Sequence, residues 1–403
     1  MIAVWDDHEL ANNAWTGGAQ NHDPNTEGPF ADRRAAMLRA YHEWMPFRMP
    51  DPNDSLRIWR TFNWGDLVEL IMLDTRHYGR DQQPSGTFIN VNDPNLNNPN
   101  RSLLGTAQRQ WLYDRLKTSS ATWKLIGQQV MVAPLQISAF SNSFIVNADQ
   151  WDGYPAERRR LMDTIIQNNI QNVVVLTGDI HTSWGNDLPF GPGSYNSSTG
   201  AGSTAVEFVT PSITSANASF LGQFSSPSVV QSQNPHVKYV DLSRHGYIII
   251  DVTPQRVQGD WYYSNTITQP TPGETAGESW YVQAGERFLR KATSPTTAPP
   301  GYNPPLIARG ATTALTTQPS VTLLGVYPNP AQAFVTLQLY TREARTIEVK
   351  LLTVEGKEVS SYTIHTPSAG THYYQVPLEG LPAGTFLLQL KGDEVRTYRL
   401  LKR

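Results

Sequence analysis

Two short segments of the sequence gather side chains that can bind metal ions or move protons. The first runs from Asp6 to Asn13 and holds three carboxylates, one imidazole and two carboxamides in eight positions. Hard and borderline metal ions prefer oxygen donors of this kind together with an imidazole nitrogen. The segment is therefore a candidate metal-binding loop. The alternative is a polar loop in which an aspartate caps a following helix.

The second segment follows an apolar run. Residues 172–177 read Asn-Val-Val-Val-Leu-Thr, which is typical of a strand buried on both faces, and Gly178, Asp179 and His181 come directly after it. Ligands of α/β proteins commonly bind beyond the carboxyl ends of such strands. Because side chains alternate along an extended chain, Asp179 and His181 are predicted to point to the same side. The alternative is a capping aspartate beside an incidental histidine.

The elements that must position these segments alternate up to about residue 290. A hairpin turn is expected at Gly65-Asp66, and together the elements predict an α/β (α+β) layered core with helices packed over sheets. Helices are predicted at residues 31–45, 106–117 and 157–168, and strands at 1–5, 57–64, 67–73, 123–130, 172–177, 206–210, 246–252 and 258–263.

The pattern changes after residue 290. Residues 291–320 are rich in Thr, Pro and Ala, which predicts an extended linker. Residues 321–403 show period-2 alternation and turn glycines, which predict a small all-β sandwich. Its strands are expected at residues 335–340, 347–354, 373–377, 385–390 and 397–401. The sequence thus predicts a catalytic domain over residues 1–290, a linker, and a β domain over 321–403.

Composition narrows the possible functions. The chain has no cysteine, so a metal site must use oxygen and imidazole ligands, and neither disulfides nor thiol nucleophiles are possible. The formal net charge is −3 with no basic run, so no nucleic-acid-binding surface is expected. The sequence has no run of about 18 apolar residues, so it predicts no transmembrane helix.

The two chemically dense segments together resemble the PhoD family of calcineurin-like metallophosphoesterases. Trp-Asp-Asp-His-Glu at residues 5–9 is similar to one metal-binding element of that family, and Gly-Asp-Ile-His at residues 178–181 to another. Further landmarks cover nearly the whole region before the linker and occur in the family's order. They are Arg34, Ala40-Tyr41 through Pro46, Arg60 to Asp66, Leu73 to Arg76, Leu104-Gly105 with Gln108, Trp111-Leu112, Trp151 to Tyr154, Glu207-Phe208 and His245 to Tyr247.

This resemblance implies a dinuclear metal site, with iron and calcium, that holds a phosphoester and a hydroxide for in-line attack. It implies that Asp7, Asp179 and His181 are metal ligands, with Asp6 and Asn13 as weaker candidates. The likeness also implies a role for His8, which would donate a proton to the phosphoryl or leaving-group oxygen.

Other residues are assigned to the substrate pocket. Arg76 would contact the phosphate in a bidentate manner, or else form a structural ion pair with Asp74 or Asp66. Trp184 and His245 are expected to contact substrate, and His236 to line the pocket. The alternative for each of these two histidines is an ordinary core or loop position. The remaining histidines, His22, His42, His77, His365 and His372, are predicted to be surface residues.

The resemblance also implies a missing part. Members of the family carry an upstream Gly-Asp-x-x-Tyr segment, whose Asp bridges the metals, and a cysteine that binds iron. The sequence has no cysteine and no such segment upstream of Trp5, and the chain opens directly with a predicted core strand. The metallophosphoesterase-like sandwich is therefore predicted to be incomplete at its N-terminus, so that the metal pair would not assemble in this chain alone.

The β domain has a resemblance of its own. Tyr-Pro-Asn-Pro at residues 327–330, Leu-Pro-Ala-Gly at 381–384 and the closing Leu-Leu-Lys-Arg resemble the C-terminal sorting domain of the type IX secretion system. The alternative is an adhesive or carbohydrate-binding sandwich. The resemblance implies the type IX machinery as a partner and a secreted or cell-surface location.

The sequence therefore predicts a secreted metal-dependent phosphoester hydrolase, an alkaline phosphatase or phosphodiesterase. The alternative function is a catalytically inactive cell-surface or binding protein that keeps the fold without the metal pair.

Overall fold

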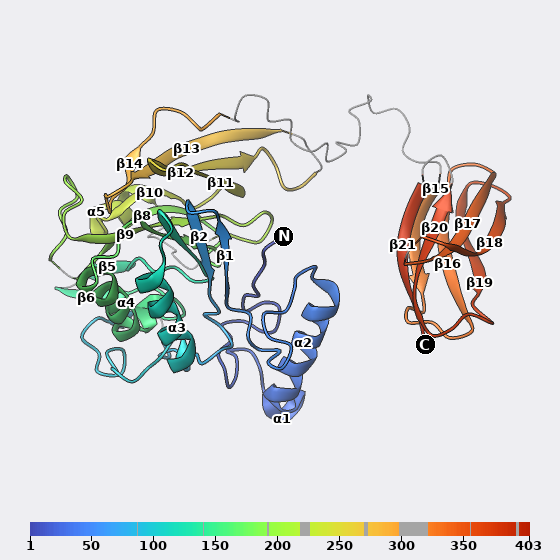
Figure 1. The fold of residues 1–403 in the computed structure, drawn as a ribbon, viewed down its shortest axis with the longest axis horizontal. Coiled ribbons are helices and arrows are strands. Elements are labelled where there is room, and N and C mark those ends of the chain that lie inside the picture. Colours follow the sequence, from blue (N-terminus) through green and yellow to red (C-terminus); the bar gives the residue numbers. More distant parts are fainter. Residues whose placement is uncertain are drawn as a thin grey trace. The chain divides into compact units, whose positions relative to one another are not determined.

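The chain forms two compact units, Met1–Ala298 and Pro299–Arg403, which are called the first and second units below (Figure 1). The structure is a computed structural model, and it describes residues 1–403 except 87, 140, 192, 218–225, 270–272, 298–320, 355 and 392–394. Most of the predicted linker lies outside the described residues. Its first residue, Lys291, still belongs to a strand of the first unit, β14 (Arg290–Lys291).

A seven-stranded mixed sheet forms the centre of the first unit, in the order β1-β2-β4-β7-β9-β8-β10. The four strands β2, β4, β7 and β9 run parallel to one another, and β1, β8 and β10 each pair antiparallel with their neighbours. The strands are β1 Arg60–Trp64, β2 Val68–Met72, β4 Trp123–Gly127, β7 Val173–Thr177, β8 Ser183–Pro189, β9 Ser203–Val209 and β10 Val237–Asp241.

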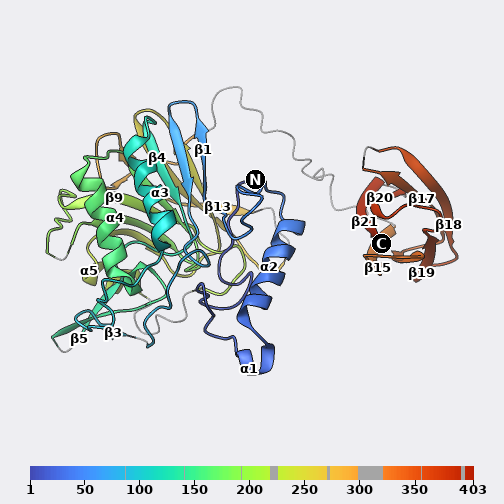
Figure 2. The same ribbon diagram turned by 60° about the horizontal axis from the view of Figure 1, so that its bottom comes forward.

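Both faces of this sheet are covered. Helices α3 (Gly105–Thr118) and α4 (Pro155–Gln167) lie on one face, where Val175 of β7 packs in their core (Figure 2). The other face packs against a four-stranded antiparallel sheet, where Val174 meets Trp261. That sheet consists of β11 Gly246–Val252, β12 Arg256–Ser264, β13 Glu274–Gln283 and β14. Burial on both faces explains why β7 is apolar along its length, and the predicted layered α/β architecture is confirmed.

The N-terminal residues form a smaller cluster with helix α2 (Phe30–Trp44), where Trp5 is fully buried against Tyr41. The predicted strand over residues 1–5 is wrong, because these residues join no sheet ladder. Side chains bind its backbone instead: Arg60 donates to the Ala3 carbonyl, and Gln129 donates to the Trp5 carbonyl.

Short elements complete the first unit. They are α1 Pro24–Glu27, η1 Trp151–Gly153, α5 Pro227–Gln233 and a three-stranded sheet of β3 Ile89–Asn90, β5 Gln136–Ala139 and β6 Asn142–Ile145. Among the described residues, no helix combines the length and the apolar character that crossing a membrane requires.

The predicted helices are confirmed to within two residues at each end, as is the hairpin at Gly65. The first-unit strands that were not predicted are β3, β5, β6, β8, β10, β13 and β14. Strand β8 is buried along most of its length yet carries Asn186 and Asp187, both fully buried. Its polar residues hide the apolar pattern by which a strand is recognised.

The second unit is a β-sandwich, as predicted. Its core is formed by alternating residues such as Val335, Leu337 and Leu339 of one sheet and Val349 and Leu351 of the other. One sheet contains β15 Val321–Tyr327, β16 Phe334–Thr341 and β19 Gly370–Pro377. The other contains β18 Glu358–Thr366, β17 Arg345–Thr353, β20 Gly384–Lys391 and β21 Val395–Lys402. Strands β15 and β18 were not predicted.

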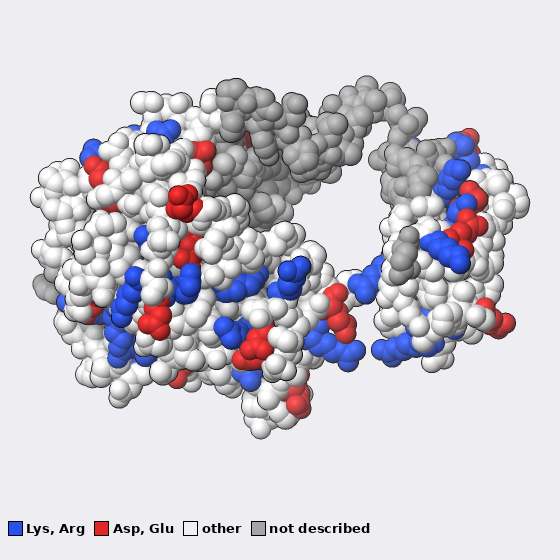
Figure 3. Space-filling view, viewed as in Figure 1, with Lys and Arg blue, Asp and Glu red and all other residues white. Residues whose placement is uncertain are grey.

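Charged side chains of both signs are interspersed over the described surface in the view of Figure 3. In the second unit, for example, Lys350 forms ion pairs with Glu348 and Glu358 on the neighbouring strands β17 and β18.

Two glycines allow the loop after β2 to touch the start of α3. Gly79 has φ +76° and Gly105 has φ +68°, and a Cβ on Gly79 would lie 2.6 Å from the Gly105 Cα. We expect Gly79→Ala to lower the free energy of unfolding by at least about 2 kcal/mol, because left-handed strain adds to a backbone clash. Gly28→Ala is the matched control, since Gly28 has φ +79° but open space around it, and should cost only about 1 kcal/mol. Urea unfolding followed by fluorescence measures both, and equal losses would contradict the close contact.

Candidate metal centre

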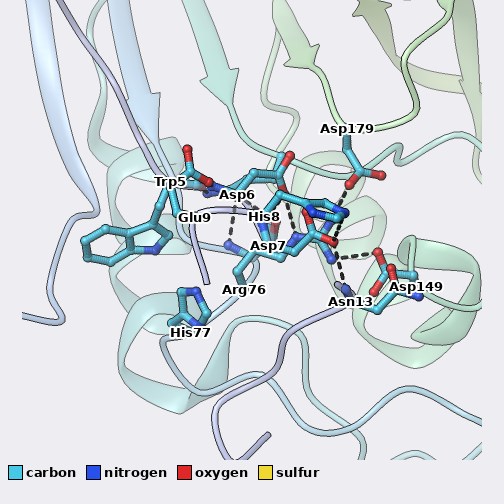
Figure 4. Close-up of polar contacts among 12 residues, drawn as sticks. Trp5, Asp6, Asp7, His8, Glu9, Asn13, Arg76, His77, Asp149 and Asp179 are labelled. Atoms are coloured by element: carbon cyan, nitrogen blue, oxygen red, sulfur yellow. Dashed lines mark hydrogen bonds and ion pairs between the residues drawn. The ribbon is translucent and has the colours of Figure 1, made fainter. Parts of the chain in front are cut away.

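Three carboxylates from the two predicted segments converge beyond the carboxyl end of β7 (Figure 4). Asp6, Asp7 and Asp179 each offer an oxygen, and these oxygens all lie within 4.8 Å of one another. These residues are called the acid cluster below. Asp7 is buried, while the side chains of Asp6 and Asp179 remain 31% and 12% exposed, so the cluster can be reached from solvent.

Local structure aims each carboxylate. The buried Trp5 indole donates to Asp74 Oδ2 at 3.0 Å, which anchors the chain just before Asp6. Asp7 Oδ2 accepts the Asn13 backbone N–H at 2.7 Å, which closes the loop behind it. At the end of β7, Asp179 has φ +64°, a left-handed conformation that is costly for a non-glycine residue and ends the strand.

The guanidinium group of Arg76 lies among these carboxylates and is fully buried (Figure 4). Its Nε donates to Asp6 Oδ1 at 2.6 Å, its Nη1 to Asp149 Oδ2 at 2.6 Å, and its Nη2 forms an ion pair with Asp179. The ion pairs predicted with Asp74 or Asp66 are wrong. Asp74 instead accepts the backbone N–H of Arg76, because its side chain caps the turn that follows β2.

The site carries more negative than positive charge. Burial raises the pKa of Asp179 well above its usual range, and Asp6, Asp149 and Asp7 add to the rise while Arg76 opposes it. Burial would also raise the pKa of Asp149, but two neighbouring guanidinium groups more than offset this and hold it low. In all, four carboxylates face two guanidinium groups: Asp6, Asp7, Asp149 and Asp179 against Arg76 and Arg80.

The acid cluster fits a metal cation on chemical grounds. Its donors are carboxylate oxygens, the ligands that hard divalent cations such as Ca²⁺ prefer. A cation would offset the excess negative charge that burial makes costly. Three carboxylates supply part of the coordination sphere of one ion.

His181 does not join this cluster. Its backbone has φ +58°, so the alternation that would have aimed it beside Asp179 is broken, and its Nδ1 lies 2.8 Å from the Ala216 carbonyl. His245 lies nearby in the same loop environment, with its Nε2 2.9 Å from the Ser215 carbonyl. The extended alternation on which the pairing of Asp179 with His181 was predicted is therefore absent here.

His8 and Asn13, both predicted to belong to the site, lie beside Asp7 of the acid cluster. The His8 side chain is 69% exposed, with its Nε2 3.1 Å from Asn12 Oδ1 and 3.9 Å from Asp7 Oδ2. The Asn13 side chain donates to Gln20 at 2.6 Å, and its backbone braces Asp7. His8 is thus free to meet a ligand at the acid cluster.

Trp184 was predicted to contact substrate, and this is wrong. Its side chain is fully buried in the core between β7 and the helices, and its indole donates to Thr182 at 2.6 Å. The position directly after the Gly-Asp-x-His element suggested a pocket residue, but β8 runs straight back into the core from there.

The histidines predicted to be at the surface include two that are buried. His77 is fully buried beside Trp5, where burial and three neighbouring arginines lower its pKa to about 3. The His22 side chain is only 2% exposed and packs against Phe30. His236 is also buried, and its Nε2 donates to the Pro134 carbonyl. It lines a cavity of about 510 Å³ to which the acid cluster does not contribute.

Comparison with known proteins places the first unit. Residues 1–261 match the family model described as PhoD-like phosphatase. The chain belongs to the PhoD-like phosphatase family. It is 35% identical over 297 residues to alkaline phosphatase D of Bacillus subtilis (strain 168), covering 73% of this chain and 49% of that protein. A solved structure described as "Structure of PhoD" is 32% identical with a TM-score of 0.64, covering 74% of this chain and 56% of that one.

The chain spans about half the length of these PhoD relatives. In the second unit, residues 325–401 match the model described as secretion system C-terminal sorting domain. The two family resemblances noted in the sequence are both confirmed.

Sequence reasoning missed three members of this PhoD-like site. Asp149 and Arg80 extend the charged network around Arg76. Gln129 forms a hydrogen bond to Trp5, which directly precedes Asp6 of that network. Asp149 is an isolated loop carboxylate two residues before the Trp-Asp-Gly-Tyr landmark, so no spacing marked it. The landmark that begins at Trp151 was the signal in the sequence that could have pointed to Asp149.

Removing the buried cation tests the charge network. We expect Arg76→Met to lower the free energy of unfolding by about 3 to 5 kcal/mol, because it leaves buried carboxylates without a partner. Arg39→Met is the control, since Arg39 pairs with Glu43 at the surface and should cost under about 1 kcal/mol. All eleven tryptophans lie in the first unit, so their fluorescence in urea follows this unit selectively. Equal losses for the two variants would refute the assignment.

The buried His236 predicts a pH dependence of stability. Burial lowers its pKa to about 4 in the folded protein, against an ordinary value of 6.5. The unfolded chain therefore binds a proton at higher pH than the folded chain does, so this contribution is fully present above pH 6.5 and is lost as the pH falls through 4. Wild type should lose about 3 kcal/mol more than His236→Gln between pH 7 and pH 4. Tryptophan-monitored urea unfolding at both pH values measures this, and parallel losses would exclude it.

Proposed function

We propose that the first unit hydrolyses phosphoesters in a metal-dependent reaction, with the acid cluster as its carboxylate ligands. The observation that supports this most is the approach of Asp6, Asp7 and Asp179 to within 4.8 Å in a domain of the PhoD-like phosphatase family. Two sequence segments about 170 residues apart supply these groups. A loop that merely caps a helix would not require such an approach.

Asp6, Asp7 and Asp179 would hold the metal, for which the family resemblance implies iron and calcium. When bound, a metal pair neutralises charge on the phosphoryl group and lowers the pKa of the attacking water. Asn13 keeps Asp7 in place through its backbone N–H. His181 bonds to the Ala216 carbonyl through its Nδ1, so its Nε2 would be the nitrogen that reaches a metal.

His8 would act as the proton donor to the leaving-group oxygen. Its imidazole is exposed at the mouth of the acid cluster, where it contacts Asn12 and lies near Asp7. A donor at this place can reach a phosphoester bound at the cluster. His245, whose Nε2 bonds to the Ser215 carbonyl, would contact the organic part of the substrate.

Arg76 would serve the reaction by holding the carboxylates in place. To contact the phosphate directly, its guanidinium group would have to release these carboxylates. All three of its nitrogen positions already pair with Asp6, Asp149 and Asp179. It fixes the spacing of oxygen donors that would otherwise repel one another.

The second unit supports a secreted or cell-surface location. Residues 325–401 match a secretion system C-terminal sorting domain, and we propose that the type IX secretion machinery is its partner. A phosphoester hydrolase exported in this way would act on substrates outside the cell.

One observation favours the alternative of a protein without catalytic activity. The Arg76 guanidinium already compensates part of the negative charge of the acid cluster. A binding protein without metal would also need this compensation. Elemental analysis of the purified full chain separates the two, because a hydrolase retains stoichiometric metal and a metal-free remnant retains none.

Substitution of the cluster tests the proposed reaction. We expect Asp7→Asn and Asp179→Asn each to lower kcat/KM for a nitrophenyl phosphoester by at least about 100-fold, because each removes a charged metal ligand. Asp163→Asn is the control, since Asp163 pairs with Arg159 on the surface of α4, and it should leave turnover unchanged. Treatment with EDTA should abolish activity and added Ca²⁺ or iron should restore it. Full activity in both cluster variants would show that the ligands lie elsewhere.

A further inference from the structure

We propose that Gln129 is a positioning residue that sets the spacing of the acid cluster; this inference rests on the proposed function above. Gln129 lies two residues after the end of β4, and its side chain is 4% exposed. It offers no atom to a substrate. Its effect would come through the three chain segments that it connects.

The side-chain amide uses its full hydrogen-bonding capacity. Its Nε2 donates to the Trp5 carbonyl at 2.8 Å and to the Leu73 carbonyl at 3.3 Å. Its Oε1 accepts the Thr75 backbone N–H at 2.9 Å and the Thr75 hydroxyl at 2.6 Å. An amide has two N–H donors and two acceptor lone pairs, so none is left over.

The backbone of the same residue makes the third connection. The Gly178 N–H donates to the Gln129 carbonyl at 3.0 Å. Trp5, Thr75 and Gly178 each immediately precede a charged residue of the site, namely Asp6, Arg76 and Asp179. One residue therefore holds the backbones from which two cluster carboxylates and their common cationic partner project.

These bonds explain why the position requires glutamine. Glutamate would keep the acceptor for Thr75 but would turn an oxygen toward the Trp5 carbonyl, where two acceptors repel each other. Methionine has nearly the same shape but no strong polar group, so it would leave the Trp5 carbonyl and the Thr75 N–H unpartnered. The orientation of the amide is fixed by its neighbours, because a flipped amide would set donor against donor at Thr75.

The adjacent Gln128 shows the difference between support of the core and support of the site. Its Nε2 donates to the Thr177 hydroxyl at 2.6 Å, and its Oε1 accepts the Trp151 indole N–H at 3.2 Å. Both partners belong to the central sheet and its helical layer. Gln129 instead reaches Trp5, which no strand ladder holds. The N-terminal half of the acid cluster depends on this tether and on the bond from the Trp5 indole to Asp74.

The test uses Gln129→Met in the full chain. We expect Ca²⁺ binding, measured by isothermal titration calorimetry, to weaken by about 10- to 100-fold, as is usual when a residue that orients metal ligands is removed. In the metal-free protein, hydrogen–deuterium exchange should be faster over residues 5–13 and unchanged over α4. Metal affinity and local exchange together distinguish positioning from a general loss of stability.

Gln258→Met is the matched control. Gln258 is fully buried on β12, in the four-stranded sheet of the first unit and away from the acid cluster. Its Nε2 donates to Asp260 and to the Ser294 carbonyl. It should lower the stability of the first unit while leaving Ca²⁺ affinity and the exchange of residues 5–13 as in wild type. If Gln129→Met does not fold, Gln129→Glu takes its place in the exchange experiment, because it keeps the shape and the Thr75 bonds.

The outcomes separate this inference from the proposed function. If wild type binds Ca²⁺ and Gln129→Met binds it equally well with unchanged exchange, Gln129 does not position the cluster. If wild type binds neither Ca²⁺ nor iron, the proposed function fails, and the exchange of residues 5–13 in the metal-free variants still decides whether Gln129 holds this segment. Equal effects in Gln258→Met would also overturn the inference.

Discussion

The buried guanidinium group of Arg76 is the interaction on which the site depends. Three carboxylates contact it directly, and each comes from a different part of the chain: Asp6, Asp149 and Asp179. Removing so many charges from water is costly, and only close pairing with good geometry offsets the cost. The first unit must therefore bring these segments together accurately, or leave charges buried without a partner.

This constraint explains why polar residues occur inside the central sheet and at its edge. Glu207 on β9 is fully buried and accepts from the Thr177 hydroxyl, from Asn186 and from the backbone N–H groups of Val132 and Ala133. These bonds tie the end of β7, two residues before Asp179, to the loop that follows β4. The rigid strand β7 thus leads into Asp179, and the amide of Gln129 holds the N-terminal segment that carries Asp6 and Asp7.

The charged groups of the site do not balance one another. Arg76 and Arg80 offset part of the negative charge of four carboxylates, and burial keeps the pKa of Asp179 raised. The exposed imidazole of His8 lies beside the cluster, with its Nε2 3.9 Å from Asp7 Oδ2. The second unit, which matches a secretion system C-terminal sorting domain, has its own hydrophobic core and contributes none of the acid-cluster residues.

The sequence by itself determined the layered architecture, because periodic apolar residues give helices such as α2 and α4 and the doubly buried β7 wherever they occur. It also identified Asp6, Asp7 and Asp179, because a dense run of polar residues next to a predicted core strand can be recognised from the order of the residues alone. Tertiary structure decided their partners. Arg76 could have paired with Asp74 by proximity in sequence, but only folding brings Asp149 and Asp179 to it.

The same distinction explains the differences from expectation at His181, Trp184 and residues 1–5. Left-handed backbone at His181 and the return of β8 into the core redirect two side chains that spacing had assigned to the pocket. Side-chain bonds from Arg60 and Gln129 replace the ladder expected for the first residues. A sequence pattern reports what each residue prefers locally, whereas burial and hydrogen bonding between distant segments are settled only when the whole chain has packed.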